Sequence, residues 1–141
     1  MRAAKALFIR HGAESTPEGR ALFIRHGAES TPEGRALLLL RHCLSPLQRR
    51  QFTQTGYFDV VGGDTGNRYR IYAGAAANVC EIGENGRPKI GLCFLPVGDL
   101  PIGDVMLAQK IALETCEASA LAVARKFTPS GFLFSRSRPL R

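Results

Sequence analysis

The chain has 141 residues, of which 45% are hydrophobic and 22% charged, as is typical of a globular domain. This length suits one domain of common size, and no apolar run reaches the ~20 residues that a membrane-spanning helix needs. The sequence therefore predicts no membrane span and no membrane partner. Its net charge of +7 and its isoelectric point near 9.8 favour an acidic partner.

The N-terminal residues do not have the pattern of a targeting signal. Arg2, Lys5 and Arg10 surround too few apolar residues for a secretory signal, and Glu14 and Glu18 argue against a transit peptide. We therefore expect a cytoplasmic location, where the four cysteines are reduced thiols.

A 15-residue unit, ALFIRHGAESTPEGR, occupies residues 6–20 and recurs without a spacer at residues 21–35. A looser third copy, ALLLLRHCLSPLQRR, follows at residues 36–50. Fifteen residues turn a helix by about 1500°, which rotates successive copies by about 60° and prevents a continuous surface. The Thr-Pro-Glu steps predict short helices that start at Pro17 and Pro32. We interpret residues 1–50 as a basic N-terminal repeat arm that carries a duplication and lies outside the core.

The Arg-His-Gly steps at residues 10–12 and 25–27 resemble the nucleophile motif of the histidine phosphatases. That resemblance implies a second histidine and an acid, both supplied from far along a larger α/β fold. The only other histidine is His42, which lies in the same N-terminal region. We therefore reject the phosphatase interpretation.

The strongest strand signals lie between Gln51 and Leu95. Runs rich in β-branched and aromatic residues, separated by turn residues, predict four antiparallel strands. The Asn85-Gly86 pair predicts a tight hairpin between the third and fourth of these. The predicted strands are Gln51–Val61, Arg68–Tyr72, Asn78–Ile82 and Pro88–Leu95.

A long helix is predicted from Asp104 to Phe127, because no glycine or proline interrupts this stretch and Asp104 suits the N-cap position. A helical period places Val105, Met106, Leu113, Cys116 and Ala120 on an apolar stripe, which we expect to pack on the sheet face that carries Val79 and Leu92. Lys110 and Glu114 are spaced for an exposed ion pair.

The predicted fold is therefore α+β: a four-stranded antiparallel β-meander packed against one long C-terminal helix, preceded by a short-helix or irregular repeat arm. The small α+β domain spans residues 51–127, and residues 128–141 form a basic C-terminal tail.

Several strings in this domain are similar to those of a family of small uncharacterised bacterial proteins. They are DTGNRYRI, ANV, the Cys-Phe pair before a Pro/Gly loop, GDVMLAQKIALE and ALAVA. The resemblance covers about residues 55–127 and leaves out the repeat. It implies a domain boundary near residue 55 and no activity or site residue.

The residues that could carry chemistry do not form a recognisable catalytic or metal site. The cysteines lack the close pairs of structural zinc sites, and His42 and Cys43, as sequence neighbours, rarely face each other. A small-molecule site at Asp99, Asp104, Gln109 and Lys110, with Asn78 nearby, is explained more simply by helix capping and loop turns. We expect no enzyme activity, no metal and no cofactor.

Two functions from different classes remain. The first is a non-catalytic protein-interaction or self-association module, with the apolar tail residues Phe132, Leu133 and Phe134 in contact with the partner. The alternative is weak, mainly electrostatic nucleic-acid binding through the arm and the tail. The residues expected to bind nucleic acid are Arg68, Arg70 and Tyr72, which alternation places on one strand face, and Arg136, Arg138 and Arg141.

Overall fold

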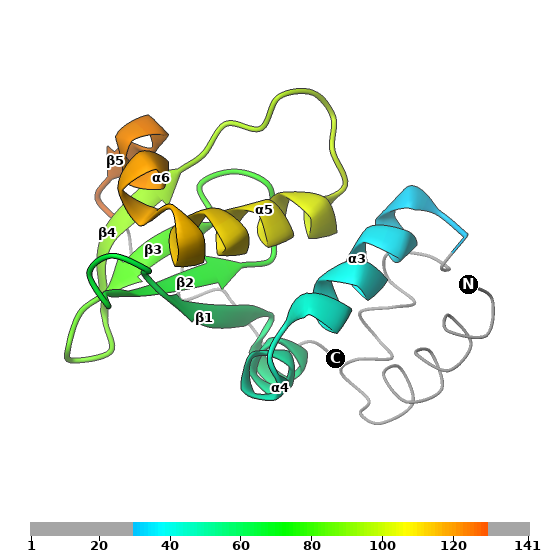
Figure 1. Cartoon of the computed structure of the whole chain (residues 1–141), viewed down its shortest axis with the longest axis horizontal. Helices are drawn as coiled ribbons and strands as arrows, with labels where there is room; N and C mark the ends of the chain where they lie inside the picture. Colours follow the sequence, from blue (N-terminus) through cyan, green and yellow to red (C-terminus); the bar gives the residue numbers. More distant parts are fainter. Residues whose placement is uncertain (1–29, 130–141) are drawn as a thin grey trace.

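The computed structural model describes residues 30–129, which form an α+β fold with a five-stranded antiparallel sheet and helices packed on it (Figure 1). In Figure 1, α5 lies across the front of the sheet, α3 lies beside the N-terminal end of α5, and α4 lies at the β1 edge. The elements are α3 (Pro32–Cys43), α4 (Pro46–Thr55), β1 (Tyr57–Val61), β2 (Arg68–Tyr72), β3 (Val79–Ile82), β4 (Pro88–Cys93), α5 (Ile102–Thr115), α6 (Glu117–Val123) and β5 (Arg125–Phe127).

The sheet is a meander in which each strand pairs with the next along the chain, in the order β1-β2-β3-β4-β5. The predicted hairpin between β3 and β4 is confirmed: Gly86 has a φ of 77°, and the Gly83 N–H donates to the Arg87 carbonyl at 2.9 Å. The strand Arg125–Phe127 was not expected. It adds to β4, with Gly91 opposite Phe127.

The core lies between the sheet and the helices. Val79 and Leu92 are register partners on the face toward the helices, as predicted, and both are buried there. A smaller cluster covers the opposite face, formed by Tyr72, Cys80 and Ile82 with Tyr57 and Phe127 packed against it. Each fully buried side chain of this size contributes roughly 1.5–3 kcal/mol. The main cluster consists of Leu37, Leu40, Leu44, Phe52, Phe58, Val60, Tyr69, Ile71, Val79, Leu92, Met106, Leu113 and Ala120.

The core includes residues before Gln51, where the folded domain was expected to begin. Leu37, Leu40 and Leu44, all in the third copy of the repeat unit, are buried in the main cluster because α3 packs against α5. Helix α3 begins at Pro32 with Thr31 as its N-cap, as predicted. The helix predicted from Pro17 lies outside the described residues.

Helix α4 occupies the start of the stretch expected to be the first strand. The prediction of a strand from Gln51 is wrong up to Thr55, because Ser45 and Gln48 form a capping box and Pro46 stands at the first helical turn. The helix ends at Gly56, whose φ of 85° is the left-handed conformation that favours glycine. Strand β1 then begins at Tyr57.

The single long helix is also corrected. Helix α5 begins at Ile102 rather than after Asp104, and the Glu33 carboxylate accepts a hydrogen bond from the Ile102 N–H at 3.2 Å. The helix breaks at Cys116, which is exposed rather than part of the apolar stripe. The chain resumes as the short α6 and then as β5. The predicted Lys110–Glu114 pair is present, with 2.6 Å between Nζ and Oε1, but it is not exposed as expected, because the two side chains are only 12% and 30% exposed.

The turn between β1 and β2 accounts for the break between α5 and α6. The Gly63 N–H donates to the Leu113 carbonyl at 3.0 Å, at the end of α5 where a continuing helix would bond the N–H of Glu117. Glu117, the first residue of α6, then points its carboxylate into that turn. The turn and the helix break are therefore one structural feature.

The Glu117 side chain is almost fully buried, at 1% exposure, and its carboxylate is completely engaged. It accepts hydrogen bonds from the N–H groups of Asp64 and Thr65 at 2.9 and 2.8 Å, from the Thr65 hydroxyl at 2.5 Å and from the Tyr69 hydroxyl at 2.6 Å. Burial by itself would raise the pKa of Glu117, but these hydrogen bonds outweigh burial and lower its pKa to about 2.

Between residues 30 and 129, no helix combines the length and the apolar character that crossing a membrane requires.

We predict that deleting residues 21–35 leaves stability nearly unchanged. The deletion places residues 6–20, which have the same sequence, directly before Ala36, so that a Thr-Pro-Glu step again begins α3. The expected change in the free energy of unfolding is below about 0.5 kcal/mol, measured by urea denaturation. Deleting both copies removes the Thr31 cap and the Glu33 contact with Ile102 and should cost about 1–3 kcal/mol. Equal losses from the two deletions would contradict this interpretation.

We predict that Glu117→Gln destabilises the fold by about 2–3 kcal/mol, because an amide loses the charge-assisted bonds and cannot accept from every donor around it. The pKa of Glu117 is lower in the folded than in the unfolded chain, so its contribution is complete above about pH 4.5 and is lost as the pH falls toward 2. Urea denaturation between pH 6 and pH 2 measures this, since Glu117→Gln should flatten the decline. An unchanged slope would contradict the assignment.

Candidate functional site

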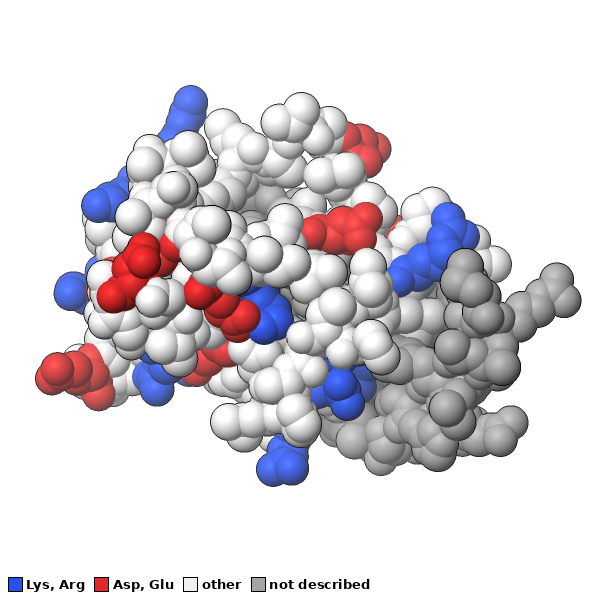
Figure 2. Space-filling view, viewed as in Figure 1, with Lys and Arg blue, Asp and Glu red and all other residues white. Residues whose placement is uncertain are grey.

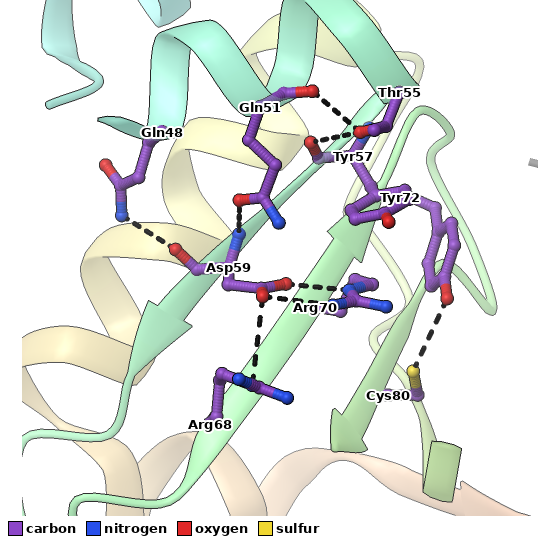
Figure 3. Close-up of polar contacts among 9 residues, drawn as sticks. All are labelled: Gln48, Gln51, Thr55, Tyr57, Asp59, Arg68, Arg70, Tyr72 and Cys80. Carbon is purple, nitrogen blue, oxygen red and sulfur yellow. Dashed lines mark hydrogen bonds and ion pairs between the residues drawn. The ribbon is translucent and has the colours of Figure 1, made fainter. Parts of the chain in front are cut away.

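Arg68, Arg70 and Tyr72 lie on one face of β2, as alternation predicts (Figure 3). This is the face opposite the helices, where Tyr72 belongs to the smaller apolar cluster. These three residues are the part of the expected nucleic-acid site that the structure describes. Arg136, Arg138 and Arg141 lie outside residues 30–129.

The Arg70 guanidinium is held by neighbours on β1. It donates from Nε and Nη2 to the two carboxylate oxygens of Asp59, at 2.8 and 3.1 Å, and lies 4.3 Å from the centroid of the Tyr57 ring. Burial by itself would lower the pKa of Arg70, but the hydrogen bonds and charge of Asp59 outweigh it and raise the pKa. This bidentate pair occupies the Nε–Nη2 fork, one of the two donor pairs with which an arginine can hold a phosphate.

The other two residues of this face differ in how accessible they are. Tyr72 is buried at 8% exposure; its ring lies 5.3 Å from that of Tyr57, and its hydroxyl is 4.0 Å from the Cys80 sulfur. Burial raises the pKa of Cys80 to about 11, so the thiol stays protonated at neutral pH. Arg68 is about half exposed and only 3.8 Å from Asp59. Of these three residues, only Arg68 is therefore an accessible cation, and Tyr72 offers no open ring on which a base could stack.

Side chains of α4 close the outer edge of the sheet along β1 (Figure 3). Gln51 accepts from the Asp59 N–H at 2.8 Å, and Gln48 donates to the Asp59 carbonyl at 2.9 Å. The Thr55 hydroxyl accepts from the Tyr57 N–H at 3.2 Å, and its single proton lies within reach of two acceptors, the Gln51 carbonyl at 2.7 Å and the Tyr57 carbonyl at 3.0 Å. These contacts occupy N–H and carbonyl groups on the outer edge of β1, which a strand added at that edge would have to hydrogen-bond. The spacing of Gln48, Gln51 and Thr55 on one helix face is the signal that sequence reasoning missed.

A second surface lies on the helix side, between α5 and the loop that precedes it. There a groove of about 220 Å³ runs along α5. Its lining is apolar apart from one amide side chain, and that amide is used internally: Gln109 and the buried Asn78 exchange two hydrogen bonds, at 2.9 and 3.0 Å. The lining residues are Phe94, Leu95, Pro96, Leu100, Val105, Ala108, Gln109 and Ala112.

The rim of this groove is also apolar and exposed. Of the lining residues, Leu95 is 61% and Leu100 49% exposed, and Val97, which follows the lining residue Pro96 in the chain, is 91% exposed. Figure 2 shows a largely uncharged surface over this loop, whereas acidic and basic side chains lie along α5, and Asp99 is the only charged residue in the segment 94–101. Contiguous exposed apolar surface of this kind is typical of interaction sites.

The remaining sequence candidates do not converge on a site. Asn78 and Gln109 bind each other, and Lys110 binds Glu114, so these polar groups have internal partners. Within the described part of the chain, no three metal-ligating side chains come together. The predicted partner-binding residues Phe132, Leu133 and Phe134 lie outside it.

Comparison of the chain with protein-family models, with curated proteins and with solved structures finds no match. The resemblance of residues 55–127 to a family of small bacterial proteins therefore stays a prediction.

We predict that Arg70→Met lowers stability by about 1–3 kcal/mol, because it leaves the Asp59 carboxylate, only 19% exposed, without its bidentate partner. The same change should leave the affinity for a single-stranded oligonucleotide within about twofold, since this guanidinium is already paired. Urea denaturation and fluorescence anisotropy measure the two effects. Arg87→Met, at an exposed position in the β3–β4 turn, is the matched control for removal of one positive charge. A selective loss of oligonucleotide affinity in Arg70→Met would contradict this account.

Proposed function

We propose that the protein is a non-catalytic self-association module whose contact surface is the apolar groove between α5 and the loop 94–101. The observation that carries this proposal is the groove itself, with its exposed rim of Leu95, Val97 and Leu100. An exposed patch of this kind is unfavourable in water and is relieved when a partner covers it.

A second copy of the chain is the partner that this surface suits. The rim carries exposed bulky side chains, Leu95 and Val97, while the floor includes the small residues Ala108 and Ala112. A surface with both an apolar rim and a groove can be self-complementary, with the rim of each copy against the groove of the other. A two-fold contact of this type closes after two copies.

The charge distribution also suits contact between two copies. The described residues 30–129 contain eleven Lys and Arg and nine Asp and Glu, a net charge of +2, and the groove lining contains none of these. Two positively charged chains can therefore meet at this surface without placing like charges against each other. Strand addition at β1 is the less favourable route, because Gln48, Gln51 and Thr55 cover that edge.

We predict that Leu100→Glu and Ala108→Glu each weaken self-association at least about tenfold, equivalent to ~1.4 kcal/mol, because each buries a charge in an apolar contact. Sedimentation velocity of the full chain over a wide concentration range measures the monomer–dimer equilibrium. Leu47→Glu is the matched control, since Leu47 is a 72% exposed leucine on α4, outside the groove.

A chain that stays monomeric at every concentration would overturn this proposal. So would equal weakening by Leu47→Glu, which would indicate a general effect of added negative charge. Far-ultraviolet circular dichroism of each variant establishes that the fold is retained.

Weak electrostatic nucleic-acid binding is the second candidate, and the observation that favours it is the location of the charge. Eight Lys and Arg but only three Glu lie in residues 1–29 and 130–141, which carry +5 of the total +7. Such binding should fall steeply with salt, whereas association through an apolar groove should not. With no Trp and three Tyr, the chain absorbs little at 280 nm, so copurified nucleic acid would dominate the ultraviolet spectrum.

A further inference from the structure

A pocket of about 640 Å³ lies between α4 and the β1 edge of the sheet, and it shares no lining residue with the groove beside α5. This volume is typical of small-molecule sites. Figure 3 shows part of this α4–β1 pocket: Gln48 and Gln51 of α4 point toward Asp59 of β1, and Arg68 reaches toward Asp59 from β2. The lining includes Arg50, Gln51, Asp59, Val61, Arg68 and Glu114.

The two acidic residues of the pocket already have cationic partners. The Asp59 carboxylate accepts from Arg70 at 2.8 and 3.1 Å. The Glu114 carboxylate accepts from the Lys110 ammonium at 2.6 Å and from the Gln48 amide at 3.3 Å. A cation that entered the pocket would have to displace one of these partners, so the pocket does not suit a cationic ligand.

The basic side chains of the pocket, in contrast, have donors to spare. Among residues 30–129, the Arg50 side chain forms no ion pair or hydrogen bond. Arg68 approaches Asp59 only to 3.8 Å through its Nε, and its two terminal nitrogens have no partner in the same part of the chain. The Gln51 oxygen accepts from the Asp59 N–H at 2.8 Å, so its NH₂ group faces away from that contact as a further donor. Together these groups favour a negatively charged ligand.

Two exposed apolar side chains border the same pocket. Leu47 of α4 is 72% exposed, and Val61 of β1 is 59% exposed. A ligand that covers them removes apolar surface from water, while the guanidinium groups hold its acidic group. The pocket therefore suits a ligand with an anionic end and an apolar body.

We propose that the α4–β1 pocket binds a small phosphate monoester that has an apolar substituent. Arg50, Arg68 and the Gln51 amide hold the phosphate group. Leu47 and Val61 contact the substituent. A monoester carries a charge of about −1.5 to −2 at neutral pH, which matches the two arginines. A carboxylate has one charge and two oxygens to share between two guanidinium groups, and a nucleic-acid phosphodiester also has one charge, so both match less well.

The test uses phenyl phosphate as the probe, with isothermal titration calorimetry of the full chain near neutral pH and at constant ionic strength. Phenyl phosphate should bind more tightly than inorganic phosphate, which lacks the ring, and more tightly than benzoate, which has a single charge. Arg50→Met and Arg68→Met should each weaken its binding at least about tenfold, because each removes one of the two guanidinium groups. Val61→Ser should weaken the binding of phenyl phosphate and leave that of inorganic phosphate unchanged.

Arg87→Met is the matched control, because it removes one positive charge at an exposed position outside the pocket and should bind phenyl phosphate like the parent chain. Far-ultraviolet circular dichroism establishes that each variant keeps its fold. The proposal is overturned if phenyl phosphate does not bind at concentrations up to about 10 mM, or if benzoate or inorganic phosphate binds as tightly. It is equally overturned if Arg87→Met weakens binding as much as Arg68→Met, which would indicate a general attraction to a positively charged chain.

Discussion

The buried carboxylate of Glu117 is the interaction on which the arrangement of the sheet and its helices depends. It joins the first residue of α6 to the turn between β1 and β2, more than fifty residues earlier in the chain. Gly62 and Gly63, at the start of this turn, are necessary for the contact with Glu117. A Cβ atom at Gly62 would lie 2.3 Å from the Glu117 carboxyl group, and one at Gly63 would lie 2.2 Å from the Glu114 carbonyl. Because the turn replaces the helical bonding of Leu113, α5 must end there, and the chain is redirected so that Arg125–Phe127 can pair with β4.

Once α5 is fixed on the sheet at this end, its other end determines where α3 packs. Gly103 lies so close to α3 that a Cβ atom there would be 2.6 Å from the Ala36 carbonyl oxygen. This close approach brings Leu37 and Leu40 into the main core and lets Glu33 accept from the Ile102 N–H. The third copy of the repeat unit is therefore structural. The second copy, which is identical to the first, contributes through its last residues, which supply the cap and first turn of α3.

The parts of the fold that could be predicted from sequence are those with local causes. β2, β3 and β4 follow from alternation and from the Asn85-Gly86 turn, and α3 from its Thr-Pro step. The break at Cys116 is marked by no glycine or proline in the sequence, and the bonds that compete with the helix come from the distant residues Gly63 and Asp64. The candidate site was likewise predictable only where its cause is local. Alternation placed Arg68, Arg70 and Tyr72 together, but the pairing of Arg70 with Asp59 depends on the β1–β2 register, which no pattern in the sequence indicates.

Most of the polar groups that look functional in the sequence are used to hold the described structure together. Asp59 pairs with Arg70, Asn78 with Gln109, and Glu117 with the β1–β2 turn. These side chains therefore form their hydrogen bonds within the protein. The apolar groove beside α5 is different, because it presents exposed apolar side chains rather than paired polar groups. Such a surface is stabilised by contact with another apolar surface, and that contact involves no chemical transformation. The proposed function is accordingly a binding function, and its surface is formed by α5 and the loop 94–101 rather than by residues 132–134 or the β2 face that the sequence indicated.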